Sequence, residues 1–351
     1  GNQVGQCTSE AMGMMLRYAV NSKNKNLFEN LTNGYAYLSS KGIGDGLIPW
    51  SYKVDSGAVT ILDPGSALDA DIMSIGEMIQ GLQLFGSSTL GNGQSLDAVI
   101  KQSIIGLAKD DIVSPNTYAP GNHWGGSHTV WDGPKFYDYV DFANVQRILG
   151  FCKSNSMAPE MNKITDATNQ YINYELVNAE AVATKPGGDN SASLVRVLIY
   201  LGLFASNPKN KTSPFYKNLG KLLYQVVTLA MKAKTLSVTY DPHAGWFGNN
   251  GVKIFEDKNQ YATIGAYLVA LNALSKSGYT EILGTPIDNL TKTGTAILNS
   301  YLKNGDDGNS IIKQLTSDIQ NKTQWNNGIY FNYMMFTECW PVLSTINGVK
   351  P

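Results

Sequence analysis

The feature of this sequence that most constrains its fold is a long series of amphipathic helical patterns. Apolar residues recur at spacings of three and four in about twelve segments, and no strands alternate with these segments as they do in a βαβ fold. The predicted helices cover residues 7–21, 26–40, 69–85, 95–108, 134–150, 160–181, 191–206, 213–234, 258–277, 285–303, 308–320 and 328–346. Short β-type segments at 54–61 and 236–240 fall in the loops. The sequence therefore predicts an all-α protein.

The helical segments point to a single domain over residues 1–351. No stretch rich in Pro, Ser or charge divides the chain, and no fixed period marks a helical solenoid. About twelve helices in one domain fit a closed ring of helical hairpins, although periodicity alone does not separate a ring from another all-α fold. The long loops hold much of the Trp, His and Gly, so we expect the functional site there.

Composition narrows the class of ligand. The net charge is −1, only 16% of residues are charged, and no run of Lys and Arg occurs. These values argue against binding to nucleic acid or to an anionic membrane. Nineteen Tyr, eleven Phe and six Trp accompany many uncharged polar residues, a combination that favours a neutral, hydroxyl-rich ligand such as a carbohydrate.

Neither a metal site nor a disulfide framework is predicted, and the proposed chemistry needs no cofactor. The residues that would supply either are scattered, without CxxC or HExxH spacing: Cys7, Cys152, Cys339, His123, His128 and His243. The sequence contains no apolar run of about 18 residues, which is the length that a membrane-spanning helix needs. The chain begins at Gly1 without Met, so we interpret it as a trimmed or mature form and expect an extracytoplasmic protein, secreted or anchored through a removed segment.

The first candidate for chemistry is Glu10, in the sequence QCTSEAMGMMLRYAV. Ser9 offers an N-cap hydroxyl, which places Glu10 in the first turn of a largely apolar helix. If exposed, this carboxyl group is an ordinary helix-terminal acid that the helix dipole stabilises. In a cleft, loss of solvent favours its protonated form and makes it a proton donor near neutral pH.

The second acidic site is SALDADIMSIGEM, with Asp69 as the expected N-cap and Asp71 in the first turn. The two residues are double capping acids in one interpretation. In the other, the loops before Glu10 and Asp69 lie on the same rim, and the two carboxyl groups share one groove. Paired carboxyl groups are what glycoside hydrolysis requires. Trp50, in a Gly-rich loop, then either stacks on a sugar or packs the loop.

These stretches, taken together, resemble glycoside hydrolase family 8. TSEAMGMML resembles the family's SEGxGYGML stretch, which implies that Glu10 is the general acid. GLIPW resembles GLMxW, which implies that Trp50 forms a sugar-stacking wall. ALDADIMSIGEMI resembles A[ST]DADxxIAxAL, which implies that Asp69 holds the sugar ring at the cleavage subsite.

The resemblance continues in order to the end of the chain, through HWGG, the Phe136–Tyr137 pair, SLVRVLIY and IYFNYMMFTECW. It implies an (α/α)6 barrel, which agrees with the helix count. The residues that it assigns to substrate binding are Trp50, Trp124, Tyr137, Arg196 and Tyr330. We add Asp71, the acid that lies two positions after Asp69.

One position departs from the family pattern. The usual catalytic base is the Asp of DAxR, three residues before the Arg, and here that position holds Ser193. The pKa of a serine hydroxyl group lies far above 7, so Ser193 cannot take a proton from water by itself. The family's chitosanase-like branch also lacks that Asp. Asp189, in the KPGGDNSAS run, is our first candidate for the base, and Asp166, in NKITDATNQY, is the second.

The sequence thus predicts a monomeric, inverting endo-glycosidase that cleaves a β-1,4-linked polysaccharide. The missing base favours a polymer that contains amino sugars or a biofilm exopolysaccharide. The alternative is a polysaccharide-binding protein on the same fold that has lost turnover. A polysaccharide lyase is a more distant third, since it would need a basic or Tyr/His constellation.

Overall fold

The structure, a computed structural model, describes residues 6–113, 115–122, 140–184, 189–232, 261–301 and 338–349, together with residues 313, 317 and 336. The contacts between residues divide the chain into two compact units, Gly1–Asn173 and Tyr174–Pro351. The single domain stays a prediction, and each unit is described by itself. None of the helices in these ranges is long and apolar enough to cross a bilayer.

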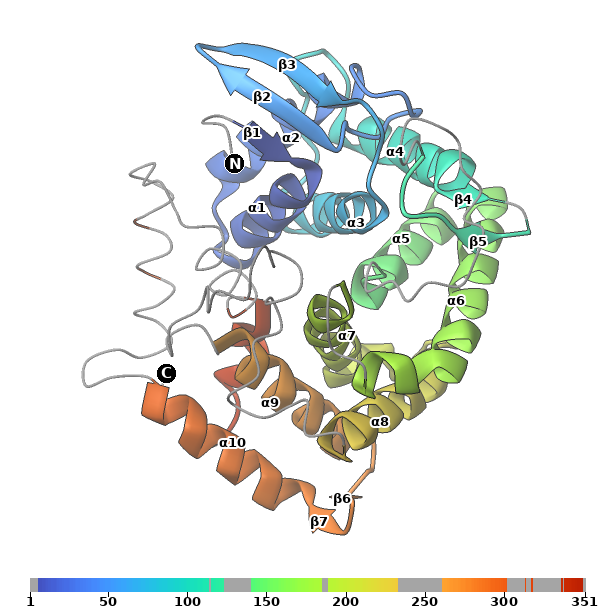
Figure 1. The fold of residues 1–351 in the computed structure, drawn as a ribbon. Coiled ribbons are helices and arrows are strands. Elements are labelled where there is room, and N and C mark those ends of the chain that lie inside the picture. The colour runs from blue at the N-terminus through green and yellow to red at the C-terminus, as the bar shows by residue number, and fades with distance from the viewer. Residues whose placement is uncertain are drawn as a thin grey trace. The chain divides into compact units, whose positions relative to one another are not determined.

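The first unit is built on three helices, α1 (Ser9–Asn21), α3 (Leu68–Phe85) and α5 (Phe142–Ser154), with α3 packed between the other two. The helix α2 (Lys25–Ser39) packs on α1 and α3, and α4 (Leu96–Asp110) packs on α3 (Figure 1). The helix α6 (Ala158–Thr184) begins in this unit and ends in the second. Most of α3 is buried, which explains its nearly continuous apolar sequence.

In the described ranges, three small antiparallel sheets accompany the helices. In the first unit, β1 (Gln6–Thr8), β2 (Ser51–Asp55) and β3 (Ala58–Asp63) form one sheet in that order, and β4 (Ile112–Val113) pairs with β5 (Thr117–Tyr118). The predicted segment 54–61 is in fact a hairpin, because Ser56 and Gly57 both have positive φ and reverse the chain between β2 and β3.

The second unit holds α7 (Asp189–Ser206), a 3₁₀ turn (Pro208–Thr212), α8 (Tyr216–Lys232), α9 (Tyr261–Lys276), the pair β6 (Glu281–Ile282) and β7 (Thr285–Pro286), and α10 (Ile287–Tyr301). The helices α7 and α9 pack closely on each other, α8 lies against both of them, and α10 lies against α9 (Figure 1). A Cβ on Gly202 would lie 2.6 Å from Val269 Cγ1, so glycine permits this approach.

The described helices agree with the predicted ranges to within three residues, with one exception. The start of α5 was predicted at residue 134, but the helix begins at Phe142 because Asp141 accepts hydrogen bonds from the N–H groups of Ala143 and Asn144. The predicted strand 236–240 lies outside the described residues, and the predicted helices 308–320 and 328–346 lie largely outside them.

The helices α1 and α3 run parallel and in register. A Cβ on Gly13 would lie 3.1 Å from the side chain of Met73, and one turn further Arg17 Nε donates to Glu77 Oε1 over 2.9 Å. Both contacts join residues that are 60 positions apart in the sequence. Because two successive turns keep the same offset, the N-termini of the two helices lie at the same end.

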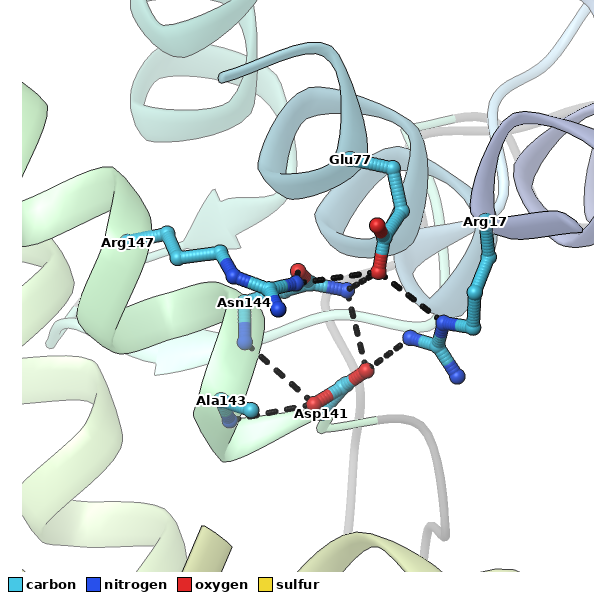
Figure 2. Close-up of polar contacts among 6 residues, drawn as sticks. All are labelled: Arg17, Glu77, Asp141, Ala143, Asn144 and Arg147. Atoms are coloured by element: carbon cyan, nitrogen blue, oxygen red, sulfur yellow. Dashed lines mark hydrogen bonds and ion pairs between the residues drawn. The ribbon is translucent and has the colours of Figure 1, made fainter. Parts of the chain in front are cut away.

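A buried ion-pair network joins α1 and α3 to α5 (Figure 2). Arg17 bonds both Glu77 and Asp141, and Arg147 Nη1 donates to Glu77 over 3.0 Å. Asn144 Nδ2 bridges the two acids at 3.3 and 2.9 Å. Burial by itself raises the pKa of Glu77, but the charges of Arg147 and Arg17 outweigh burial and hold that pKa below its usual value. Two cations therefore balance two anions.

We expect Arg17→Met to lower the free energy of unfolding by about 3 to 5 kcal/mol, because it leaves buried carboxylates without their cation. The matched control is Lys101→Met, which breaks the more exposed Lys101–Asp97 pair on α4 and costs less than about 0.5 kcal/mol. Urea unfolding at pH 7 measures both. Equal losses in the two variants would contradict the importance of the network.

Candidate active site

The start of α1 is held by the sheet. The strand β1 pairs with β2, with Thr8 opposite Ser51, and the Ser9 N–H then donates to the Trp50 carbonyl oxygen over 2.9 Å. The predicted N-cap at Ser9 is wrong. The N-cap is Thr8, which makes no side-chain capping bond, and Ser9 is the first helical residue, with its hydroxyl buried and unpartnered among the described residues. A main-chain carbonyl group replaces the expected side-chain cap.

Glu10, the second residue of α1, is half-buried. Its Oε1 accepts a hydrogen bond from the indole Nε1–H of Trp50 over 2.9 Å. Its Oε2 is buried and has no hydrogen-bond partner in the part of the chain that the structure describes. Such an orphaned oxygen is costly unless a ligand completes it, which is typical of a functional position.

Tyr52 lies near both Glu10 and Cys7, and neither Tyr52 nor Cys7 was expected near the site. The two residues face each other across the β1–β2 pair. Burial raises the pKa of Tyr52, and Cys7 and Glu10 raise it further. Burial also raises the pKa of Cys7. Both side chains are therefore neutral near pH 7, and they give Glu10 surroundings without a compensating cation among these contacts.

Asp69 is the second residue of α3, as Glu10 is of α1, and it is only 4% exposed. The predicted N-cap at Asp69 is wrong, because the N-cap is Ala67. The first N–H group of the helix, that of Leu68, donates to the Pro120 carbonyl oxygen over 2.9 Å. Asp69 Oδ1 accepts from the Ala70 N–H over 2.9 Å.

The register of α1 on α3 brings these two acids together. With a constant offset of 60 positions, Glu10 lies level with Ala70, next to Asp69, at the shared end of the two helices. The loops are tied at the same end, because the Trp50 N–H donates to the Gly65 carbonyl oxygen over 2.5 Å. The expectation that the loops before both acids meet is therefore supported.

A loop after β5 supports the start of α3. The Ser66 N–H donates to Asn122 Oδ1 over 2.8 Å, and the Asn122 N–H donates to Ser66 Oγ over 3.0 Å. Gly121 allows this approach, since a Cβ there would lie 2.0 Å from the Ser66 carbonyl oxygen. The described part of the loop ends at Asn122, directly before the HWGG sequence.

Asp71 lies in the interior beside Asp111, a residue that sequence reasoning missed. Both are 0% exposed. Ser66 Oγ donates to Asp111 Oδ1 over 2.8 Å, while Asp111 Oδ2 and both oxygens of Asp71 find no donor among the described residues. Two ionised carboxylates buried side by side repel each other, so this placement favours the protonated form of at least one of them. This placement favours a structural part for Asp71 over direct contact with substrate.

Burial favours the protonated form of both acids. It raises the pKa of Asp71, and the charges of Asp111 and Asp69 raise it further. Burial also raises the pKa of Asp111, to about 7. No local sequence pattern identified Asp111, because its raised pKa comes from burial in the folded protein and its neighbour Asp71 lies 40 positions away in the sequence.

The other predicted residues fall into two groups. Asp166 is exposed on α6 and accepts from Asn116 Nδ2 over 3.3 Å, and no contact among the described residues joins it to Glu10. Asp189 is the first residue of α7, which also carries Ser193 and Arg196. Several predicted residues lie outside the described ranges: Trp124, Phe136, Tyr137, Tyr330, His123, His128 and His243.

A pair of carboxyl groups at one end of two parallel helices, one beside an indole, is the arrangement expected of a glycoside hydrolase. The model of the glycosyl hydrolases family 8 matches residues 1–238, and the chain belongs to this family. It is therefore a glycoside hydrolase. A comparison with curated proteins finds no match.

Solved structures support the fold. A reducing-end-xylose releasing exo-oligoxylanase is similar with a TM-score of 0.58 at 10% identity, over 95% of this chain and 81% of that one. An endo-1,4-D-glucanase from Vibrio fischeri ES114 has a TM-score of 0.53 at 15% identity, over 97% and 88%. A β-1,3-1,4-glucanase from Paenibacillus sp. X4 has a TM-score of 0.56 at 15% identity, over 96% and 83%. Together with the family match, they confirm the predicted all-α, (α/α)6-barrel class.

The buried pair predicts a pH dependence of stability. The native state holds a proton that an unfolded Asp releases near pH 4, so the pair's contribution is greatest at low pH and is lost as pH rises through about 7. We expect Asp71→Asn to reduce this loss, which is on the order of 2 to 4 kcal/mol, because the variant has one buried, titrating carboxyl group in place of two.

Urea unfolding of both proteins between pH 4 and pH 8 measures this difference. The control is Asp97→Asn on the exposed surface of α4, which should leave the profile unchanged. Parallel profiles for the wild type and Asp71→Asn would show that the pair holds no proton of its own.

Proposed function

We propose that this protein is an inverting endo-glycosidase that hydrolyses a β-1,4-linked polysaccharide, specifically a bacterial exopolysaccharide or an amino-sugar-containing glycan. The observation that carries this proposal is the pair of acids, Glu10 and Asp69, each the second residue of one of two adjacent parallel helices. Glu10 donates a proton to the glycosidic oxygen, and Asp69 holds the distorted sugar ring by hydrogen bonding.

The similar solved structures bear on the substrate class. Their names refer to an exo-oligoxylanase, an endo-1,4-D-glucanase and a β-1,3-1,4-glucanase. A β-linked polysaccharide is therefore the substrate class that we propose. Ser193 in place of the usual base favours an amino-sugar polymer, as in the chitosanase-like branch of the family that this chain resembles.

Asp189 is the better candidate for the base. It is the first residue of α7 and lies four positions, about one helical turn, before Ser193, which holds the place of the usual base. An inverting enzyme leaves about 6.5–9.5 Å between its two carboxyl groups for the attacking water, which a base shifted by one turn can satisfy. Asp166 is exposed and engaged by Asn116.

The remaining parts of the proposal follow from the sequence. Trp124, Tyr137, Arg196 and Tyr330 line the substrate groove, and the protein acts as an extracytoplasmic monomer. The competing function is a polysaccharide-binding protein that has lost turnover, which Ser193 would explain. The buried, unpartnered Oε2 of Glu10 favours the enzyme, because a protein that only binds sugar has no need for a desolvated acid.

We expect wild-type protein to release new reducing ends from one polymer in a panel of chitosan, β-glucan, xylan and amino-sugar exopolysaccharides. Glu10→Gln should lower this rate by more than about 10²-fold, because it removes the general acid and keeps the size of the side chain. Glu29→Gln, on the exposed surface of α2, is the control and should retain full activity. Binding without new ends from any polymer would support the binding protein instead.

The two candidate bases are separated by Asp189→Asn and Asp166→Asn. We expect the first to lower kcat by more than about 10²-fold and the second to leave it within about twofold, since Asp166 faces the solvent. Proton NMR of the first product should show the α-anomer released from a β-linked substrate, as inversion requires. Loss of activity in Asp166→Asn alone would reverse the assignment, and a β-anomer would exclude inversion.

A further inference from the structure

We propose that Trp50 is a positioning residue that acts through Glu10. Its indole N–H fixes the orientation of the carboxyl group, so that Oε1 remains a hydrogen-bond acceptor and Oε2 carries the proton that catalysis transfers. This inference rests on the proposed function, in which Glu10 is the general acid. It adds to the stacking role that the resemblance implies for Trp50.

The main chain of Trp50 is anchored on both sides. Its N–H donates to the Gly65 carbonyl oxygen over 2.5 Å, and its carbonyl oxygen accepts from the Ser9 N–H over 2.9 Å. The next residue, Ser51, begins β2 and pairs with Thr8 of β1. Trp50 is thus tied both to the start of α1 and to the loop that leads into α3, and its indole reaches Glu10 from a fixed base.

The hydrogen bond from the indole distinguishes the two oxygens of Glu10. An indole nitrogen can only donate, so Oε1, at 2.9 Å, must act as an acceptor. A protonated carboxyl group has one acceptor oxygen and one O–H group. The indole therefore favours the arrangement in which the proton resides on Oε2.

The surroundings of Glu10 leave Oε2 as the atom that meets the substrate. Acids in the first turn of a helix commonly bond its free N–H groups, but among the described residues the Trp50 indole is the donor that Glu10 engages. Oε2 is buried with no partner among these residues. The glycosidic oxygen of a bound polysaccharide supplies the missing acceptor.

In the proposed reaction, Glu10 protonates the leaving group. The proton moves from Oε2 to the glycosidic oxygen while the bond between this oxygen and the anomeric carbon breaks, and the bonding electrons stay with the leaving oxygen. Water adds to the anomeric carbon from the opposite face and gives a proton to the base. The indole N–H stabilises the carboxylate that Glu10 becomes. Exchange with solvent later returns a proton to Glu10 and removes the one that the base took from water.

The test separates positioning from stacking by the leaving group. Two substrates are built on the sugar that wild type cleaves in the reducing-end panel: the natural oligosaccharide and its 2,4-dinitrophenyl β-glycoside. Dinitrophenolate leaves without protonation, so its release does not need the acid. Two replacements of Trp50 remove the N–H group: Trp50→Phe, which keeps an aromatic ring, and β-(3-benzothienyl)alanine, which also keeps the shape of the indole.

We expect kcat for the oligosaccharide to fall by about 10- to 100-fold in both variants, because each variant loses part of the rate enhancement that general-acid catalysis supplies. On the dinitrophenyl glycoside, kcat should stay within about threefold, and KM should change little on either substrate. In the Glu10→Gln background, Trp50→Phe should cost less than about threefold, since the acid is already absent. Thermal unfolding controls for folding of Trp50→Phe, and the benzothienyl variant decides the matter if that protein is unstable.

A rise in KM on both substrates with unchanged kcat would overturn the inference and leave Trp50 as a stacking wall. Equal losses of kcat on the two substrates would also overturn it, because the effect would then not pass through proton donation. A wild type that cleaves neither substrate overturns the proposed function itself, which distinguishes the two failures.

Discussion

The arrangement of the first unit depends on the parallel, in-register packing of α1 on α3. Gly13 lets the helices approach at Met73, and one turn further Arg17 meets Glu77. Arg17 also bonds Asp141, the N-cap of α5, so a single buried guanidinium joins three helices. Such a network contributes less to stability than its number of bonds suggests, because desolvation offsets the attraction. The network nevertheless requires one specific arrangement of its side chains, and it therefore keeps the three helices from sliding along one another.

This register determines where the chemistry lies. Since the offset is constant along the two helices, their N-termini coincide, and the second residue of each is an acid, Glu10 or Asp69. The sheet locks the same end, because Trp50 bonds both Ser9 and Gly65 through its main chain. The indole of Trp50 is thereby presented to Glu10. The geometry of the proposed catalytic site thus follows from helix packing two turns away and from the three-stranded sheet of β1, β2 and β3.

The errors of the sequence interpretation share one cause. Ser9 and Asp69 were predicted as N-caps because each directly precedes an apolar helical pattern, yet carbonyl groups of Trp50 and Pro120 satisfy the first N–H groups instead. These acceptors come from loops about 40 and 50 positions away, which no local pattern reveals. The assignment of Asp71 to substrate stays a prediction, and its neighbour Asp111 escaped notice for the same reason, since the two meet only when α3 is buried.

The sequence by itself determined the helical class, the boundaries of most helices to within three residues, and the family, because hydrophobic periodicity and short motifs are local properties of a chain. It also singled out Glu10, Asp69 and Trp50. Only the tertiary structure decided that Trp50 donates to Glu10, that Asp71 is buried beside Asp111, and that one oxygen of Glu10 is buried with no partner among the described residues. Hydrogen bonding and desolvation depend on which distant segments meet, and this is set by the packing of α1 on α3 and not by spacing along the chain.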